Sequence, residues 1–85
     1  MTPNFEIIYA KSAVKDIEKL DKVAKRKLKL KIEQYLKEPL RNAKKLINPM
    51  IGSYRWSVGN YRIVFDVDGK IIVVLKIGHR KDVYG

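Results

Sequence analysis

The sequence contains no cysteine and only one histidine, His79. A zinc site of the usual cysteine and histidine type therefore cannot be assembled from this chain alone. A glycine-rich phosphate-binding loop is also missing, and no spaced pair of carboxylates suggests a two-metal or glycosidase site. Nucleotide hydrolysis and zinc-dependent hydrolysis are excluded on these grounds. We expect any chemistry that the chain performs to need no metal and no other cofactor.

Long apolar runs are absent from the start of the chain. Asp16, Glu18 and several lysines interrupt the first twenty residues, so neither a signal peptide nor a membrane-spanning helix fits there. We therefore expect a cytoplasmic protein without a membrane partner.

Acidic residues are few. Lys and Arg number 19 against 9 Asp and Glu, which gives a net charge of +10 on a chain of only 85 residues. The resulting positive field favours polyanions, so nucleic acid is the leading class of partner. The alternative is a lysine-rich solvated surface of the kind found in proteins from hot environments. Charge alone does not decide between these two interpretations.

The length allows one domain, residues 1–85, because a chain this short cannot divide its apolar residues between two cores. Hydrophobic residues make up 46% of the chain, enough for one core without disulfides or a structural metal.

Changes of hydrophobic period predict a strand and then two helices. The strand spans Asn4–Tyr9, where apolar and polar residues alternate. Ser12 is the predicted N-cap of a short helix, and Asp21 caps a second helix over 22–37 that Pro39 ends. Each helix carries one apolar stripe at helical spacing, formed by Val14, Ile17 and Leu20 in the first and by Ala24, Leu28, Ile32, Tyr35 and Leu36 in the second.

The second half of the chain is predicted to be all strand. The β-rich runs 54–58, 61–67 and 70–77 are separated by Gly59-Asn60 and Asp68-Gly69, two-residue turn signals that predict consecutive antiparallel hairpins. The order is β-α-α-β-β-β, an α+β fold in which the helical hairpin covers one face of the sheet. The other face remains available.

The arginines of these strands share a face in the alternating pattern. Arg55 and Ser57 lie on one side of their strand, and Arg62 lies on one side of the next; the residues on the opposite sides are Tyr54, Trp56, Val58, Ile63 and Phe65. Arginine suits a phosphate because its planar fork gives two charge-assisted hydrogen bonds. We interpret Trp56 as a core or partner-facing residue without a catalytic role.

Together with residues just after the last strand, these arginines provide the groups that RNA cleavage needs. Cleaving RNA without a metal requires a base for the 2′-hydroxyl, cations for the phosphate and an acid for the leaving oxygen. Arg55, Arg62 and Arg80 are the candidate cations, with a surface or salt-bridging role as the alternative for each. The remaining candidates are His79 for proton transfer, Tyr84 for stacking on a base or orienting the nucleophile, and Lys44, Lys45 and Lys81 for RNA binding.

Two of these groups have ordinary structural alternatives. A lone histidine such as His79 is often a passive surface residue or a hydrogen-bonded cap. Tyr84 could instead anchor the chain end against the sheet.

The segments Gly59-Asn60-Tyr61-Arg62-Ile63-Val64-Phe65 and Ile77-Gly78-His79-Arg80-Lys81-Asp82-Val83-Tyr84, together with Ala43-Lys44-Lys45-Leu46, resemble the RelE toxins of the RelE/ParE superfamily. The resemblance covers nearly the whole chain. It implies a microbial RNase fold and cleavage of mRNA in the ribosomal A site, leaving a 2′,3′-cyclic phosphate. It also implies a RelB-like protein antitoxin and a toxin-antitoxin hetero-oligomer.

By position, the resemblance assigns the site to Arg55, Arg62, Arg80 and Tyr84. One departure affects it: Ser57 stands where several relatives have a second lysine, and His79 or a lysine such as Lys45 is the expected substitute. The alternatives are a ParE-like toxin that binds DNA gyrase without cleaving RNA, and a basic RNA-binding module without activity. Arg80 and Tyr84 beside Arg62 favour the nuclease.

Overall fold

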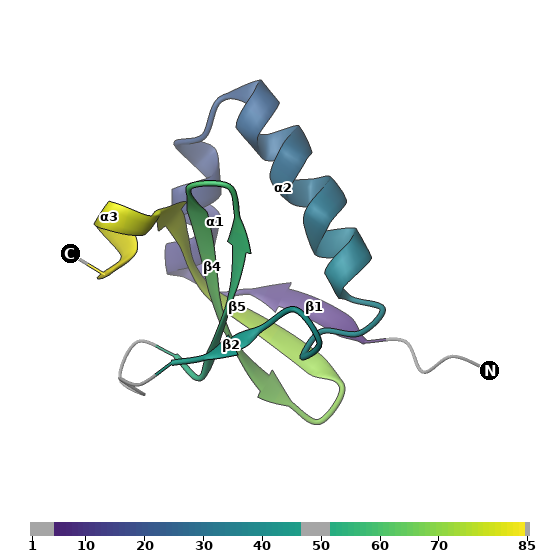
Figure 1. Ribbon diagram of the computed structural model, residues 1–85. Coiled ribbons are helices and arrows are strands. Elements are labelled where there is room, and N and C mark those ends of the chain that lie inside the picture. Colours follow the sequence, from purple (N-terminus) through teal and green to yellow (C-terminus); the bar gives the residue numbers. More distant parts are fainter. Residues whose placement is uncertain (1–4, 47–51, 85) are drawn as a thin grey trace.

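The computed structural model describes residues 5–46 and 52–84, the last of them by its backbone alone. Five strands form one sheet in the order β1-β5-β4-β3-β2, in which β1 runs parallel to β5 and all other neighbours are antiparallel (Figure 1). In chain order the elements are β1 (Glu6–Tyr9), α1 (Lys11–Glu18), α2 (Lys22–Tyr35), β2 (Lys44–Lys45), β3 (Tyr54–Val58), β4 (Tyr61–Asp68), β5 (Ile71–His79) and α3 (Arg80–Tyr84).

This order confirms the predicted α+β class, with a strand, a helical hairpin and a three-stranded meander. The sequence does not predict β2 or α3, because two and five residues are too few to show a hydrophobic period. The last strand extends to His79 instead of ending at Ile77, since His79 pairs with Tyr61. The second helix ends at Tyr35 and not at Lys37. Asn4, the predicted start of the first strand, lies outside the described residues.

A glycine begins each of the two hairpin turns. The first turn is Gly59-Asn60, as predicted, but the second is Gly69-Lys70 and not Asp68-Gly69, because Asp68 still pairs with Ile71 and β5 begins at Ile71. Gly59 and Gly69 have φ angles of 59° and 60°, in the left-handed region that disfavours other residues. Two-residue turns with such angles twist in the same sense as the strands they join, so they fix the register of β3, β4 and β5.

The two helix caps have different outcomes. The prediction for α2 is confirmed, because the Asp21 carboxylate accepts a hydrogen bond from the Ala24 backbone N–H at 2.7 Å. The prediction for α1 is wrong: its N-cap is Ala10, which makes no side-chain cap, and Ser12 lies in the first turn. The Ser12 hydroxyl donates instead to the Leu75 carbonyl oxygen at 2.7 Å.

A gap in the sheet edge explains this difference. β1 pairs with β5 only as far as Val74, so on this side of β5 the later backbone groups have no neighbouring strand, although β4 still pairs with β5 on the other side. α1 lies along this edge, where Ser12 binds the Leu75 carbonyl and the Asp16 carboxylate accepts from the Ile77 N–H at 3.0 Å. Helix α1 therefore faces the sheet through fully buried Ala13, whereas Val14 is 44% exposed, so its predicted place in the apolar stripe is wrong.

The core lies between the helical hairpin and the sheet. Trp56, Ile63 and Phe65 are fully buried there, and the Trp56 ring lies 4.2 Å from that of Phe65 between centroids. The Trp56 indole N–H donates to the Pro39 carbonyl oxygen at 2.8 Å, so its polar atom is satisfied inside the core. The other buried members are Ala13, Leu28, Ile32, Val58, Ile72, Val74 and Ile77. Trp56 is therefore a core residue, one of the two positions that the sequence allows.

The opposite face of the sheet is partly covered. Val64 lies on it and is fully buried, because Gly52 lies directly over its side chain. A Cβ atom at Gly52 would lie 2.5 Å from Val64 Cγ1, so the segment before β3 can approach the sheet this closely only with a glycine. The Asp66 carboxylate accepts from the Ser53 N–H at 2.7 Å and holds the same segment down. Only part of the arginine-bearing face is left open.

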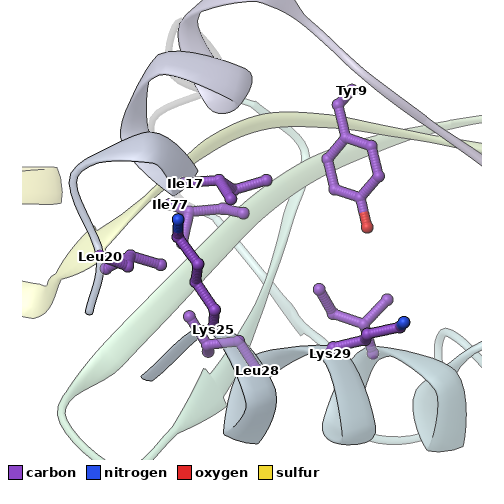
Figure 2. Close-up of a pocket in the computed structure, with 8 residues that line it drawn as sticks. Tyr9, Ile17, Leu20, Lys25, Leu28, Lys29 and Ile77 are labelled. Atoms are coloured by element: carbon purple, nitrogen blue, oxygen red, sulfur yellow. The ribbon is translucent and has the colours of Figure 1, made fainter. Parts of the chain in front are cut away.

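An apolar cavity of about 300 Å³ lies between the helical hairpin and the sheet (Figure 2). Its lining residues are Tyr9, Ile17, Leu20, Lys25, Leu28, Lys29, Ile32 and Ile77. Burial raises the pKa of the Tyr9 hydroxyl above its usual value, and the nearby Glu33 carboxylate raises this pKa further.

Within the described ranges, no helix is long and apolar enough to cross a membrane.

Candidate functional site

The strand register brings Arg55 and Arg62 to the same face of the sheet, away from the helices. Arg55 pairs with Val64 and Ser57 pairs with Arg62, so the two arginines are diagonal neighbours on adjacent strands. Diagonal pairs on one face are close enough for long side chains to reach the same small ligand. The structure thus brings two of the three candidate arginines together.

Arg55 is half-buried and is held toward the end of β3. One of its terminal nitrogens, Nη1, donates to the Ser57 hydroxyl oxygen at 3.0 Å. Ser57 is exposed and lies directly opposite Arg62. This hydrogen bond draws the Arg55 guanidinium along its strand toward the position beside Arg62.

Arg62 is held by the β3-β4 turn. Its Nη1 donates to the carbonyl oxygens of Gly59 and Tyr61, each at 2.9 Å. Its Nε is buried and has no hydrogen-bond partner among the residues that the structure describes. Such a buried donor without a partner costs about 1 to 3 kcal/mol.

Helix α3 brings Arg80 to the same turn. The Arg80 backbone N–H donates to the Asn60 carbonyl oxygen at 2.8 Å, next to the Gly59 carbonyl that binds Arg62. At its other end α3 packs buried Val83 against Gly78, where an added Cβ would already lie 3.4 Å from Val83 Cγ2. A shallow hollow here is lined by Asn60, His79, Arg80, Lys81 and Asp82. The start of α3, with Arg80 and Lys81, therefore lies at the turn that holds the Arg62 side chain.

His79 does not share the sheet face of the arginines. It pairs with Tyr61, whose ring packs against the core, and the two ring centroids lie 4.9 Å apart. Arg62 pairs with Gly78 and points to the other side. His79 is exposed at the strand end and reaches the site only through the hollow that it shares with Arg80. The side chain of Tyr84 lies outside the part of the chain that the structure describes.

The lysines divide between the two faces. Lys44 pairs with Arg55 and shares its face, whereas Lys45 pairs with Tyr54 and leaves the strand on the helix-facing side. Lys76 is a cation that the sequence reasoning missed: it is exposed, pairs with Val64, and lies on the arginine-bearing face. Its alternation with buried Ile77 is the signal that could have found it. In the described part of the chain, no three His, Asp or Glu side chains are grouped as metal ligands.

Comparison with known proteins decides the family. The family described as "ParE toxin of type II toxin-antitoxin system, parDE" matches residues 7–84. The chain is also 34% identical over 83 residues to Toxin RelE3 of Methanocaldococcus jannaschii, covering 93% of this chain and 94% of that protein. The chain belongs to the RelE/ParE toxin family. It is thus a type II toxin-antitoxin system toxin of the RelE type, as the resemblance predicts.

Solved structures show that this RelE-type toxin has the fold of the family. A chain of the RelB-RelE antitoxin-toxin complex from Methanococcus jannaschii is 32% identical, with a TM-score of 0.70 over 91% of this chain and 94% of that chain. A chain of the RelBE2 toxin-antitoxin complex from Mycobacterium tuberculosis has a TM-score of 0.77 at 23% identity, over 92% of this chain and 100% of that chain. The second likeness concerns the fold alone.

Proposed function

We propose that this RelE-type toxin is a ribosome-dependent mRNA endonuclease that cleaves mRNA in the ribosomal A site without a metal ion. The observation that carries the proposal is the pair of arginines, Arg55 and Arg62, on one open part of the sheet, with Arg80 rooted at the same turn. A phosphate fits a group of guanidinium side chains, because each planar fork can give it two charge-assisted hydrogen bonds.

The proposed reaction is an intramolecular phosphoryl transfer. The 2′-hydroxyl gives its proton to a water molecule acting as base and its oxygen attacks the adjacent phosphorus, while the bond from phosphorus to the 5′-oxygen breaks. The products are a 2′,3′-cyclic phosphate and a 5′-hydroxyl, which takes up a proton. Arg55, Arg62 and Arg80 stabilise the charge that gathers on the phosphate oxygens in the transition state.

Proton transfer is assigned to the C-terminal residues. His79 lines the same hollow as Arg80, so it can give a proton to the leaving 5′-oxygen of RNA bound there. Tyr84 is assigned to stacking on a base or orienting the 2′-hydroxyl. Lys44, Lys45 and Lys81 bind the RNA backbone and act on affinity more than on turnover.

A RelB-like antitoxin is the proposed protein partner, in a toxin-antitoxin hetero-oligomer in the cytoplasm. A chain that is 32% identical to this one was solved in the RelB-RelE antitoxin-toxin complex from Methanococcus jannaschii. The antitoxin would keep the toxin from the ribosome.

The second candidate is a ParE-like toxin that binds DNA gyrase, favoured by the description of the matching family. Translation of a defined mRNA in vitro, with the purified toxin and a chelator, separates the two. The nuclease predicts new RNA ends inside codons, mapped by primer extension, and unchanged DNA supercoiling by gyrase. Intact mRNA together with inhibited gyrase would establish the second candidate instead.

A further inference from the structure

We propose that Ser57 is a positioning residue that holds the Arg55 guanidinium beside Arg62. Arg55 then supplies a positive charge at position 57, where the serine itself carries none. This inference rests on the proposed function, because the positioned group is a cation of the proposed phosphate site. It replaces His79 and Lys45 as the substitute for a cation at position 57, since the register turns both of these to the other face.

The geometry supports this role in two ways. The backbone of Arg55 lies opposite Val64, two residues along β4 from Arg62. The backbone of Ser57 lies directly opposite Arg62. The 3.0 Å hydrogen bond from Arg55 Nη1 to Ser57 Oγ brings the guanidinium to that nearer position. Since Ser57 is exposed, this bond lies on the open surface, beyond the part that Gly52 covers.

The chemistry of the acceptor matters as much as its place. A serine hydroxyl is neutral, so it orients the guanidinium without cancelling its charge, which an aspartate or glutamate in the same place would do. A free arginine side chain would have to lose its rotamer freedom when the phosphate binds. Holding it beforehand moves that cost into the folding of the protein and favours the transition state.

The first test compares Ser57→Ala with Ser57→Thr in the in vitro translation assay, at saturating and limiting amounts of ribosome-bound mRNA. The alanine variant is expected to lose about three- to tenfold in kcat, the effect of one hydrogen bond, with little change in KM. Threonine keeps the hydroxyl and suits a strand, so it should restore most of the rate. Ser53→Ala, in the segment before β3, is the matched control and should cleave at the rate of the natural protein.

A relocation variant tests whether the place of the cation is what counts. Arg55→Ala should slow cleavage more than Ser57→Ala does, because it removes the cation altogether. Adding Ser57→Lys to Arg55→Ala puts a cation back opposite Arg62 and should recover at least tenfold of the loss, a factor within the range for one electrostatic donor. Failure to recover any rate in the folded double variant, or a threonine variant as slow as the alanine variant, would overturn the proposal.

A measurement that needs no cleavage separates this inference from the proposed function. The Nε–H of Arg55 can be followed by NMR as inorganic phosphate is added, in the natural protein and in Ser57→Ala. An ordered Arg55 that becomes mobile in the alanine variant supports positioning even if mRNA stays intact, and only the nuclease proposal would then fail. Equal order in both proteins overturns the positioning role, whatever the activity.

Discussion

At the scale of single residues, the arginines differ in how the protein holds them. Arg62 is bound by two backbone carbonyls of the β3-β4 turn, and Arg80 has its backbone fixed at the same turn. Arg62→Ala and Arg80→Ala are each expected to lose transition-state stabilisation of about 2 to 4 kcal/mol, the range for removal of one preorganised donor. Single-turnover cleavage on programmed ribosomes measures this loss.

The control for both is Arg41→Ala, which breaks only an exposed ion pair with Glu38 and should change neither cleavage nor folding. Circular dichroism should show that all three variants fold. A folded Arg62→Ala or Arg80→Ala that cleaves at the natural rate would show that the site lies elsewhere.

Tyr9 gives a residue-scale prediction on stability. Its folded-state pKa is raised above 10.0 by burial, with Glu33 adding to the effect, so the folded protein favours the neutral phenol. This contribution to the free energy of unfolding is fully present below pH 10.0 and is lost as pH rises from there through the raised pKa. The free energy of unfolding of the natural protein and of Tyr9→Phe can be measured in urea. As pH rises through this range, the natural protein should become less stable relative to Tyr9→Phe. Every other ionisable group is the same in both proteins, so a constant difference between them would refute the assignment.

At the scale of elements, side chains of α1 bind backbone groups at the edge of β5 where no strand lies beside it. Asp16→Ala leaves the Ile77 N–H without its acceptor and should lower the free energy of unfolding by about 1 to 2 kcal/mol. Asp16→Asn keeps an acceptor oxygen and should lose less. Glu18→Ala, on the exposed side of α1, is the control for a lost carboxylate. Equal stability of Asp16→Ala and Glu18→Ala in urea would contradict this role for α1.

The same edge shows which parts of the fold the sequence could predict. Turn glycines, apolar periodicity and the Asp21 cap are local signals, and the elements they predict are confirmed. Ser12 was misassigned because its partner, the Leu75 carbonyl, is 63 residues away in the chain. A local sequence pattern cannot reveal a contact between residues so far apart in the chain, and serine is predicted as a cap only because it is common at that position.

The candidate site was predictable to the same degree. Alternation along β3 and β4 was sufficient to put Arg55 and Arg62 on one face, which the register bears out. It could not show that His79 continues β5 and so faces away from Arg62, because the end of a strand is set by its pairing partner. Nor could it show the hydrogen bond between Arg55 and Ser57, which depends on the rotamers of both side chains.

At the scale of the whole molecule, the net charge of +10 should make RNA binding strongly dependent on salt. Lys44 shares the face of Arg55, and Lys81 lines the hollow beside Arg80, so each is placed to contact a backbone phosphate. Replacing either by alanine should reduce the slope of log affinity against log salt by about 0.7, the counterion release expected for one contact with single-stranded RNA. A 2′-O-methylated RNA, which cannot be cleaved, allows this slope to be measured at equilibrium.

Lys45 makes the prediction specific to geometry and not to charge alone. It carries the same charge as Lys44 and follows it in the chain, but its side chain leaves the strand on the helix-facing side. Lys45→Ala should therefore change the salt slope less than Lys44→Ala, and Lys70→Ala, at the β4-β5 turn, should leave it unchanged. If all four lysine variants, including Lys81→Ala, lowered the slope equally, RNA would be bound by the general positive field of the molecule, and the arginine-bearing face would have no special place in binding.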